Sequence, residues 1–188
     1  MTFFDVIAPV YDWLAIGKKK TASRIQKLVT FSVSDRIADI GGGTGTIAQL
    51  IAPQVKEVTV IDSSARMIRE CTKKKGLRCV VGDAHNVAFP DAYFDKIIMV
   101  DAFHHLHDQR RALQEARRVL KKQGMLIIEE FNPQRLGGLY VVLLEKVLCL
   151  GSTFYEPKKL DAFLRQEQFQ TSIYESKNKE YYIIAKKT

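Results

Sequence analysis

The stretch Asp35-Arg-Ile-Ala-Asp-Ile-Gly-Gly-Gly-Thr-Gly45 joins a short apolar run to a cluster of glycines, and a helical pattern begins directly after it at Thr46. The apolar run predicts a β-strand over 35–40. Glycines after a strand let the backbone turn sharply and let a ligand approach without a Cβ in the way. Strand, glycine turn and helix in this order predict an α/β protein with a ligand site at the turn.

Apolar runs and helical periods alternate through the chain beyond this stretch. Further strands are predicted at 58–61, 77–81, 96–100 and 125–129, and helices at 63–75 and 109–120. Strands that alternate with helices predict a mainly parallel sheet with helices on both faces.

The last third of the chain shows a different pattern. A helix is predicted over 158–168, followed by strands over 169–175 and 181–185. Ser176-Lys-Asn-Lys179 is too short to allow a parallel crossover, so these two strands should form an antiparallel hairpin.

Length and composition favour one ordinary domain. The chain has 188 residues, of which 46% are hydrophobic and 27% charged, which suits a single buried core. We expect one domain over 1–188, with an N-terminal helical cap over about 1–31 and a lid-like insertion over about 132–157.

The cysteines and the start of the chain bear on its environment. Cys71, Cys79 and Cys149 are odd in number and show no CxxC spacing, so reduced thiols are expected, with neither a disulfide framework nor a zinc knuckle. The first residues carry Asp5 and Asp12 and lack the basic start of a signal peptide. A cytoplasmic location is the simplest expectation.

The most apolar stretch is Leu136-Gly-Gly-Leu-Tyr-Val-Val-Leu-Leu-Glu-Lys-Val-Leu-Cys-Leu150. It is too short to span a bilayer, and Glu145 and Lys146 interrupt it. We expect a buried helix or a lid helix. The wall of an apolar substrate pocket, a homodimer face and a peripheral membrane contact remain alternatives.

The spacing of the glycines and their flanking acids indicates which ligand binds. Gly41, Gly43 and Gly45 follow G-x-G-x-G, whereas dinucleotide sites show a third small residue one position later, where Thr46 stands. Asp62 ends the next predicted strand, 21 residues after Gly41, where a carboxylate can accept both ribose hydroxyls or can cap a helix.

Asp39, two residues before the glycines, suits a cationic ammonium and would repel a pyrophosphate. Asp39 therefore favours S-adenosyl-L-methionine over a dinucleotide, although it could also only brace the loop.

Two further acids follow predicted strand ends. Asp83 follows the third strand and could bind an adenine amino group, with Ala84 leaving room for the ring; a turn aspartate is the alternative. Asp101 follows the fourth strand. Ligands bind beyond the carboxyl ends of open parallel sheets, so Asp39, Asp62, Asp83 and Asp101 predict a cofactor-binding rim.

Asp101, His104 and His105 are the candidate catalytic residues. A histidine near neutral pH can take a proton from a nucleophile, but two adjacent histidines could also begin a helix. His85 and His107 are isolated, and no metal-triad spacing is evident, so no metal is expected.

Five segments together resemble the ubiquinone/menaquinone biosynthesis type of class I, Rossmann-like methyltransferases (methyltransferase type 11). They are listed in chain order: Phe4-Asp-Val-Ile-Ala-Pro-Val-Tyr-Asp12, Asp39 to Gly45, Ser63-Ser-Ala-Arg-Met67, Phe89-Pro-Asp-Ala-Tyr-Phe-Asp95 and Glu115 to Gly124. The resemblance covers nearly the whole chain. It implies a seven-stranded sheet whose last strand is antiparallel.

The resemblance also implies the residues that touch the cofactor: Tyr11, Gly41, Gly43, Asp62, Met67, Asp83 and Ala84. Ser63 stands directly after the ribose acid Asp62 and is expected to touch the cofactor as well. Methyl transfer from S-adenosyl-L-methionine, leaving S-adenosyl-L-homocysteine, is the expected reaction. A small, apolar acceptor is expected, covered by the 136–150 segment with Tyr11, Trp13 and Tyr140.

Two alternatives stay open. A net charge of +8 favours an RNA or protein substrate, but the chain shows no appended binding domain, and the Asp101-Ala-Phe-His104 strand end differs from the Asn/Asp-Pro-Pro-Tyr/Phe of amine methyltransferases on nucleic acids. A module that holds the cofactor without catalysis is the second alternative. The lysine runs otherwise fit a solvated surface.

Overall fold

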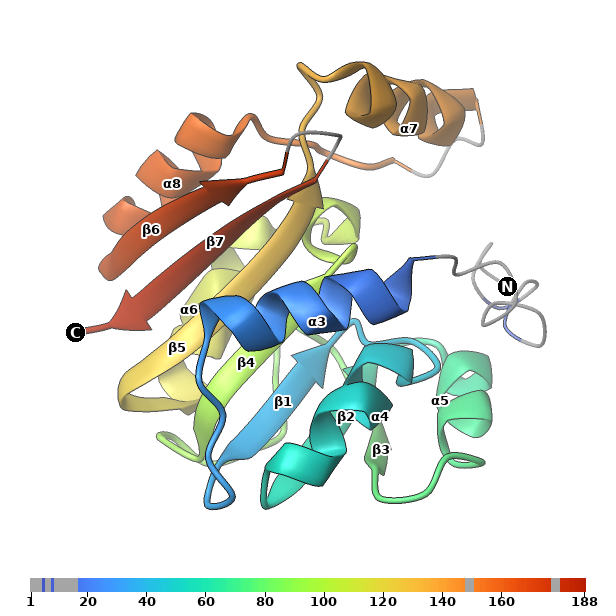
Figure 1. The fold of residues 1–188 in the computed structure, drawn as a ribbon, viewed down its shortest axis with the longest axis vertical. Helices are drawn as coiled ribbons and strands as arrows, with labels where there is room; N and C mark the ends of the chain where they lie inside the picture. Colours follow the sequence, from blue (N-terminus) through green and yellow to red (C-terminus); the bar gives the residue numbers. More distant parts are fainter. Residues whose placement is uncertain (1–4, 6–7, 9–16, 148–150, 177–179) are drawn as a thin grey trace.

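The computed structural model describes Asp5, Ala8 and residues 17–147, 151–176 and 180–188. Within these residues a seven-stranded sheet has the order β3-β2-β1-β4-β5-β7-β6. The strands are β1 (Arg36–Ile40), β2 (Glu57–Asp62), β3 (Arg78–Val81), β4 (Phe94–Val100), β5 (Leu120–Phe131), β6 (Phe169–Glu175) and β7 (Glu180–Lys187). The first five strands pair in parallel, and β7 runs antiparallel to both β5 and β6 (Figure 1).

Helices cover both faces of this sheet, with α3 and α4 in front and α6 behind in Figure 1. The helices are α3 (Lys18–Leu28), α4 (Thr46–Ile51), α5 (Ala65–Cys71), α6 (Gln109–Val119), α7 (Leu136–Val147) and α8 (Pro157–Gln166), with short 3₁₀ turns at Ala52–Gln54 and Phe103–His105. The Rossmann-like architecture with an antiparallel C-terminal hairpin is therefore confirmed.

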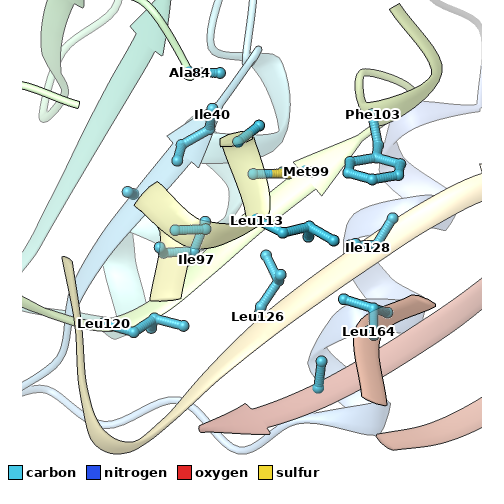
Figure 2. Packing of buried hydrophobic residues seen from close by; sticks show 14 of the residues in the cluster. Ile40, Ala84, Ile97, Met99, Phe103, Leu113, Leu120, Leu126, Ile128 and Leu164 are labelled. Carbon is cyan, nitrogen blue, oxygen red and sulfur yellow. The ribbon is translucent and has the colours of Figure 1, made fainter. Parts of the chain in front are cut away.

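The core lies on both faces of the sheet because successive side chains of a strand point to opposite sides. Along β4, Ile97 and Met99 pack toward α6, whereas Ile98 packs toward α3 and α4. Figure 2 shows Leu113 of α6 among Ile97 and Leu126 on the first face. This two-sided burial holds the carboxyl ends of the central strands in fixed positions.

Two predicted elements differ from the structure by more than two residues at one end. The helix expected over 63–75 ends at Cys71, because Lys73 and Lys74 donate to carbonyls only three residues back, which tightens the chain into turns. The strand expected over 125–129 extends from Leu120 to Phe131, since Leu120 pairs with Phe94 beyond an irregularity in the ladder.

The prediction of reduced cysteines is wrong for one pair. Cys71 at the end of α5 and Cys79 in β3 form a disulfide, with their Cα atoms 6.1 Å apart. After α5 the chain turns back through Gly76 onto β3, and this turn brings together two thiols that no CxxC spacing links. Cys149 lies outside the described residues.

Of the two helices expected for the apolar 136–150 segment, the buried one is wrong for the described residues 136–147, and the lid helix stays a prediction. Within α7 only Gly138 is buried. Its large apolar side chains are exposed, namely Leu136, Leu139, Tyr140, Leu143, Leu144 and Val147. A Cβ on Gly138 would lie 1.9 Å from the Asn132 carbonyl oxygen, so α7 touches the end of β5 closely at that one residue.

No helix among the described residues combines the length and apolar character needed to cross a membrane.

Candidate functional site

Four aspartates lie at one edge of the sheet, as predicted. Asp39 is in β1, Asp62 ends β2, and Asp83 and Asp101 come just after β3 and β4. These four strands are parallel neighbours in the order β3-β2-β1-β4. Their carboxyl ends therefore meet at the same edge, where open α/β sheets bind ligands.

The glycine loop lies directly over Asp39 and Ala102. A Cβ on Gly41 would be 2.6 Å from the Ala102 Cβ, and one on Gly42 would be 2.5 Å from the Asp39 Cγ. Gly41 also has a φ of 71°, which side chains with a Cβ rarely adopt. The loop can follow this path only with glycine at these two positions.

Gly45 serves packing. Its added Cβ would meet Leu77 Cδ1 at 2.8 Å and Cys71 Sγ at 3.1 Å, so this glycine faces the core. It stands directly before α4 in a left-handed conformation.

Asp62 joins the glycine loop to the following helix. Its two carboxylate oxygens accept hydrogen bonds from the backbone N–H groups of Gly43 (2.9 Å) and Ser64 (2.8 Å). Burial raises the pKa of Asp62. Each carboxylate oxygen has a second acceptor position, so the carboxylate is held in place and can still bind hydroxyl groups.

Ser64, and not the exposed Ser63, caps α5. Its Oγ accepts from the Met67 N–H at 3.2 Å and donates to Asp5 Oδ1 at 2.7 Å. Asp5 therefore connects the N-terminal segment to the rim beside Asp62.

Asp39 is a buried carboxyl with an unsatisfied atom. Its side chain is almost fully buried, and Oδ2 has no hydrogen-bond partner among the residues that the structure describes. Burial raises the pKa of Asp39 to about 7, against the opposing field of Lys18. Because an unpaired buried acceptor is costly, this atom favours a ligand that brings a hydrogen-bond donor or a positive charge.

The third strand end carries a more open group. Asp83 is exposed, and its Oδ1 accepts from the backbone N–H of His85 at 2.9 Å, which lowers the pKa of Asp83. Ala84 and Met67 are buried. The cofactor contacts predicted for these residues stay predictions.

His104 lies in a buried network of carboxylates. It is 1% exposed, its Nδ1 is 2.6 Å from Glu130 Oε2, and its backbone N–H donates to Glu130 Oε1 at 3.2 Å. Nε2 lies 3.4 Å from Glu145 Oε1 and 3.9 Å from Asp101 Oδ1. Burial disfavours the charged ring, but Glu130 and then Glu145 outweigh burial and raise the pKa of His104 to about 10.

His105 has the opposite electrostatic environment. Burial, and then the neighbouring His104, lower the pKa of His105 to about 4. Its Nδ1 lies 3.0 Å from Ser152 Oγ, and the same hydroxyl donates to Glu145 Oε2. Of the two candidate catalytic histidines, His105 is thus the one that is neutral near pH 7, whereas a pKa of about 10 keeps His104 protonated.

Asp101 connects the rim to this network. Its backbone has a φ of 55°, a left-handed conformation that costs a non-glycine residue about 1–3 kcal/mol and tends to occur at functional sites. Its carboxylate lies 3.7 Å from Lys18 Nζ on one side and close to His104 on the other.

A pocket opens beside the histidines, between α7 and the following segment. Its volume is about 370 Å³, within the range of small-molecule sites. It is lined by Val142, Glu145, Lys146, Gly151, Ser152 and Phe154. Glu145 and Ser152 belong both to this lining and to the histidine network.

Sequence reasoning missed the partners of the candidate residues. Glu130, Glu145 and Ser152 surround the histidines, and Lys18 and Asp5 reach the rim from the N-terminal segment. For Glu130 and Glu145 the sequence offered one signal, an acidic residue inside an apolar run. Tyr11 and Trp13 lie outside the described residues.

Comparisons with known proteins agree with this geometry. The family described as "Methyltransferase domain" matches residues 38–128. A demethylmenaquinone methyltransferase of Thermotoga maritima is 39% identical over 71% of this chain and 62% of its own length. A ubiquinone/menaquinone biosynthesis C-methyltransferase of Geotalea daltonii is 30% identical over 90% of this chain and 83% of its own length.

Solved structures show the same fold. An S-adenosylmethionine-dependent methyltransferase structure from Thermotoga maritima superposes with a TM-score of 0.84 at 23% identity, covering 98% of both chains. The alignment with the demethylmenaquinone methyltransferase of Thermotoga maritima spans less than two thirds of that protein's length.

Proposed function

The chain belongs to the class I S-adenosylmethionine-dependent methyltransferases of the ubiquinone/menaquinone biosynthesis type, and from this premise we propose that it methylates a small, apolar acceptor. When bound, S-adenosyl-L-methionine supplies an electrophilic methyl group. One observation carries the proposal: the buried, unpartnered Asp39 oxygen lies beneath a glycine loop that Asp62 fixes.

The rim residues fit the cofactor by their chemistry. Asp62 offers oxygens to the ribose hydroxyls, and Asp39 offers a buried carboxylate to the cationic amino-acid end. A side chain at Gly41 would take the space above Ala102. Asp83 and Ala84 would meet the adenine, and Asp101, with Lys18 beside it, would face the end nearest the acceptor.

The acceptor side is formed by the pocket and α7. The pocket borders Val142 and Phe154, which offer apolar surface, and Glu145 and Ser152, which offer polar groups. The pKa of His105 is lowered to about 4, so its ring is neutral near pH 7 and is only a weak base toward an acceptor that keeps its proton. The protein's main contribution would be to hold acceptor and methyl group in line and to exclude water.

The function is tested with methyl-labelled cofactor and a set of acceptors. We expect label in a solvent-extractable product when the acceptor is an apolar phenol or hydroquinone, together with S-adenosyl-L-homocysteine. The variant Asp62→Ala should lose this activity, and Asp91→Ala, an exposed aspartate before β4, should keep it. Label that appears only in tRNA or protein, or in no acceptor, would contradict the proposal.

Cofactor affinity should depend on pH through Asp39. Because the pKa of Asp39 is about 7 in the cofactor-free chain, its carboxyl is mostly neutral at pH 6 and mostly ionised at pH 8. A cationic ligand prefers the ionised form, so the affinity should rise up to about tenfold over this interval. Calorimetry with S-adenosyl-L-homocysteine measures it; Asp39→Asn should flatten the profile, and an equally steep profile in that variant would refute the assignment.

The free energy of unfolding of the cofactor-free chain should fall as pH rises, whereas the cofactor affinity should rise. The folded-state pKa of Asp39 is raised from 3.8 to about 7. The folded state therefore binds more protons than the unfolded state between these values, and this contribution to stability is lost as pH rises through about 7.

Four expectations from the sequence stay predictions. They are the single domain with its cap and lid, a homodimer, peripheral membrane contact through the exposed face of α7, and a cytoplasmic location.

A further inference from the structure

His104, His105 and Glu145 converge on one point beside the pocket. One possible ligand atom from each residue lies within 4.8 Å of those of the other two. His104 Nε2 is 3.4 Å from Glu145 Oε1, and His105 Nδ1 is 3.9 Å from Glu145 Oε2. We propose that these three residues form a binding site for a divalent transition-metal ion of the zinc type.

The distances fit such an ion. Zinc takes histidine nitrogens and carboxylate oxygens at about 2.0–2.2 Å, which places neighbouring ligands of a tetrahedron about 3.4 Å apart. The separation of His104 Nε2 and Glu145 Oε1 already has this value. His105 Nδ1 lies 3.9 Å from the other oxygen of Glu145 and would exchange its contact with Ser152 Oγ for the ion. Glu145 lies on α7, and the histidines lie on the turn after β4.

The orientation of His104 provides an independent argument. Its Nδ1 is occupied by Glu130. Within the described part of the chain its buried Nε2 has no hydrogen-bond partner, and it faces Glu145 and Asp101. Histidines that bind metals commonly donate the other ring N–H to a carboxylate, which fixes the ring and makes the metal-binding nitrogen more basic. The Glu130–His104 pair has this arrangement.

The surrounding charges also suit a divalent cation. Glu130 and Glu145 contact His104, and Asp101 lies 3.9 Å from it. Three carboxylates thus lie around His104, whose own side chain is buried. Two imidazoles and a carboxylate suit zinc, cobalt or iron better than calcium or magnesium, which prefer oxygen ligands throughout.

The position of the site beside the pocket indicates which exogenous group a bound metal ion would take. Three protein ligands leave a fourth position of the tetrahedron for an exogenous group, and Glu145 also lines the 370 Å³ pocket. A metal ion there would bind an acceptor through a phenol, thiol or hydroxyl group and would lower the pKa of that group. The site thus selects acceptors that carry one such polar atom on an apolar body.

Cobalt(II) is the probe, because it substitutes for zinc and absorbs visible light when four-coordinate. The full chain, carrying no added histidines, is stripped with a chelator and titrated, followed by calorimetry and absorbance. The variants Glu145→Gln and His105→Asn remove one ligand each. His107→Gln is the matched control, because the exposed His107 packs against His85 and is not one of the three ligands.

We expect one cobalt ion per chain, displaced by zinc, with at least tenfold weaker binding in Glu145→Gln and His105→Asn and unchanged binding in His107→Gln. Circular dichroism confirms that each variant is folded. One folded ligand variant, Glu145→Gln or His105→Asn, is sufficient to test the proposal. Absence of saturable binding to the wild type, or equal binding by the ligand variants, overturns the proposal. Binding of S-adenosyl-L-homocysteine is measured on the same samples, so failure of the metal site remains distinct from failure of the cofactor site.

Discussion

Replacing Glu130 by alanine should lower the free energy of unfolding by about 3–5 kcal/mol, the usual cost of removing one partner from a buried ion pair. Glu130 is 2% exposed and binds both the ring and the backbone N–H of His104. Its loss would leave a buried imidazole without its main counter-charge. Urea unfolding followed by circular dichroism, with a chelator present, measures the change.

Glu129→Ala is the matched control for this experiment. Glu129 is the adjacent residue of β5 and equally buried, but burial raises its pKa to about 8, so its carboxyl is largely neutral at pH 7. Both variants delete the same atoms, and only Glu130→Ala also removes a charge partner. Similar losses in the two variants would show that the Glu130–His104 pair does not contribute as argued.

Replacing Asp62 by alanine should weaken the binding of S-adenosyl-L-homocysteine by about 1–3 kcal/mol, or about 5- to 150-fold, the scale of losing hydrogen bonds to a charged group. The variant loses the acceptors for ribose hydroxyls. It also releases the N–H groups of Gly43 and Ser64, which hold the loop and the start of α5.

Calorimetry at fixed pH measures this effect, and two controls separate its causes. Asp91→Ala removes an exposed aspartate near the opposite edge of the sheet and should bind normally. Asp62→Asn keeps one carbonyl oxygen and should give an intermediate affinity. Wild-type affinity in Asp62→Ala would mean that the ribose binds elsewhere.

The fold was predictable because its local signals agree with its tertiary arrangement. Gly41, Gly43 and Gly45 have the left-handed φ values that only glycine adopts easily, and Phe169–Glu175 was predicted to the residue. The same local patterns placed Asp39, Asp62, Asp83 and Asp101 at one edge.

The contacts across the sheet could not be predicted in this way. Glu130 reaches His104 from 26 residues away, and Glu145 reaches it from another helix. Such pairings depend on the register of β4 against β5 and on the path of α7, which no local period encodes. The sequence left the burial of α7 undecided for a related reason, since apolar composition alone does not say whether a partner element covers the helix.

A crystal structure of the chain grown with S-adenosyl-L-homocysteine tests most directly whether the rim is a nucleoside and amino-acid site. We predict ribose hydroxyls on the Asp62 carboxylate, the ligand's amino group close to Asp39, and Gly41 to Gly43 beneath the ligand without a shift of the loop. Density for the ligand at any other place, or a crevice that accepts the pyrophosphate of a dinucleotide instead, would contradict the account.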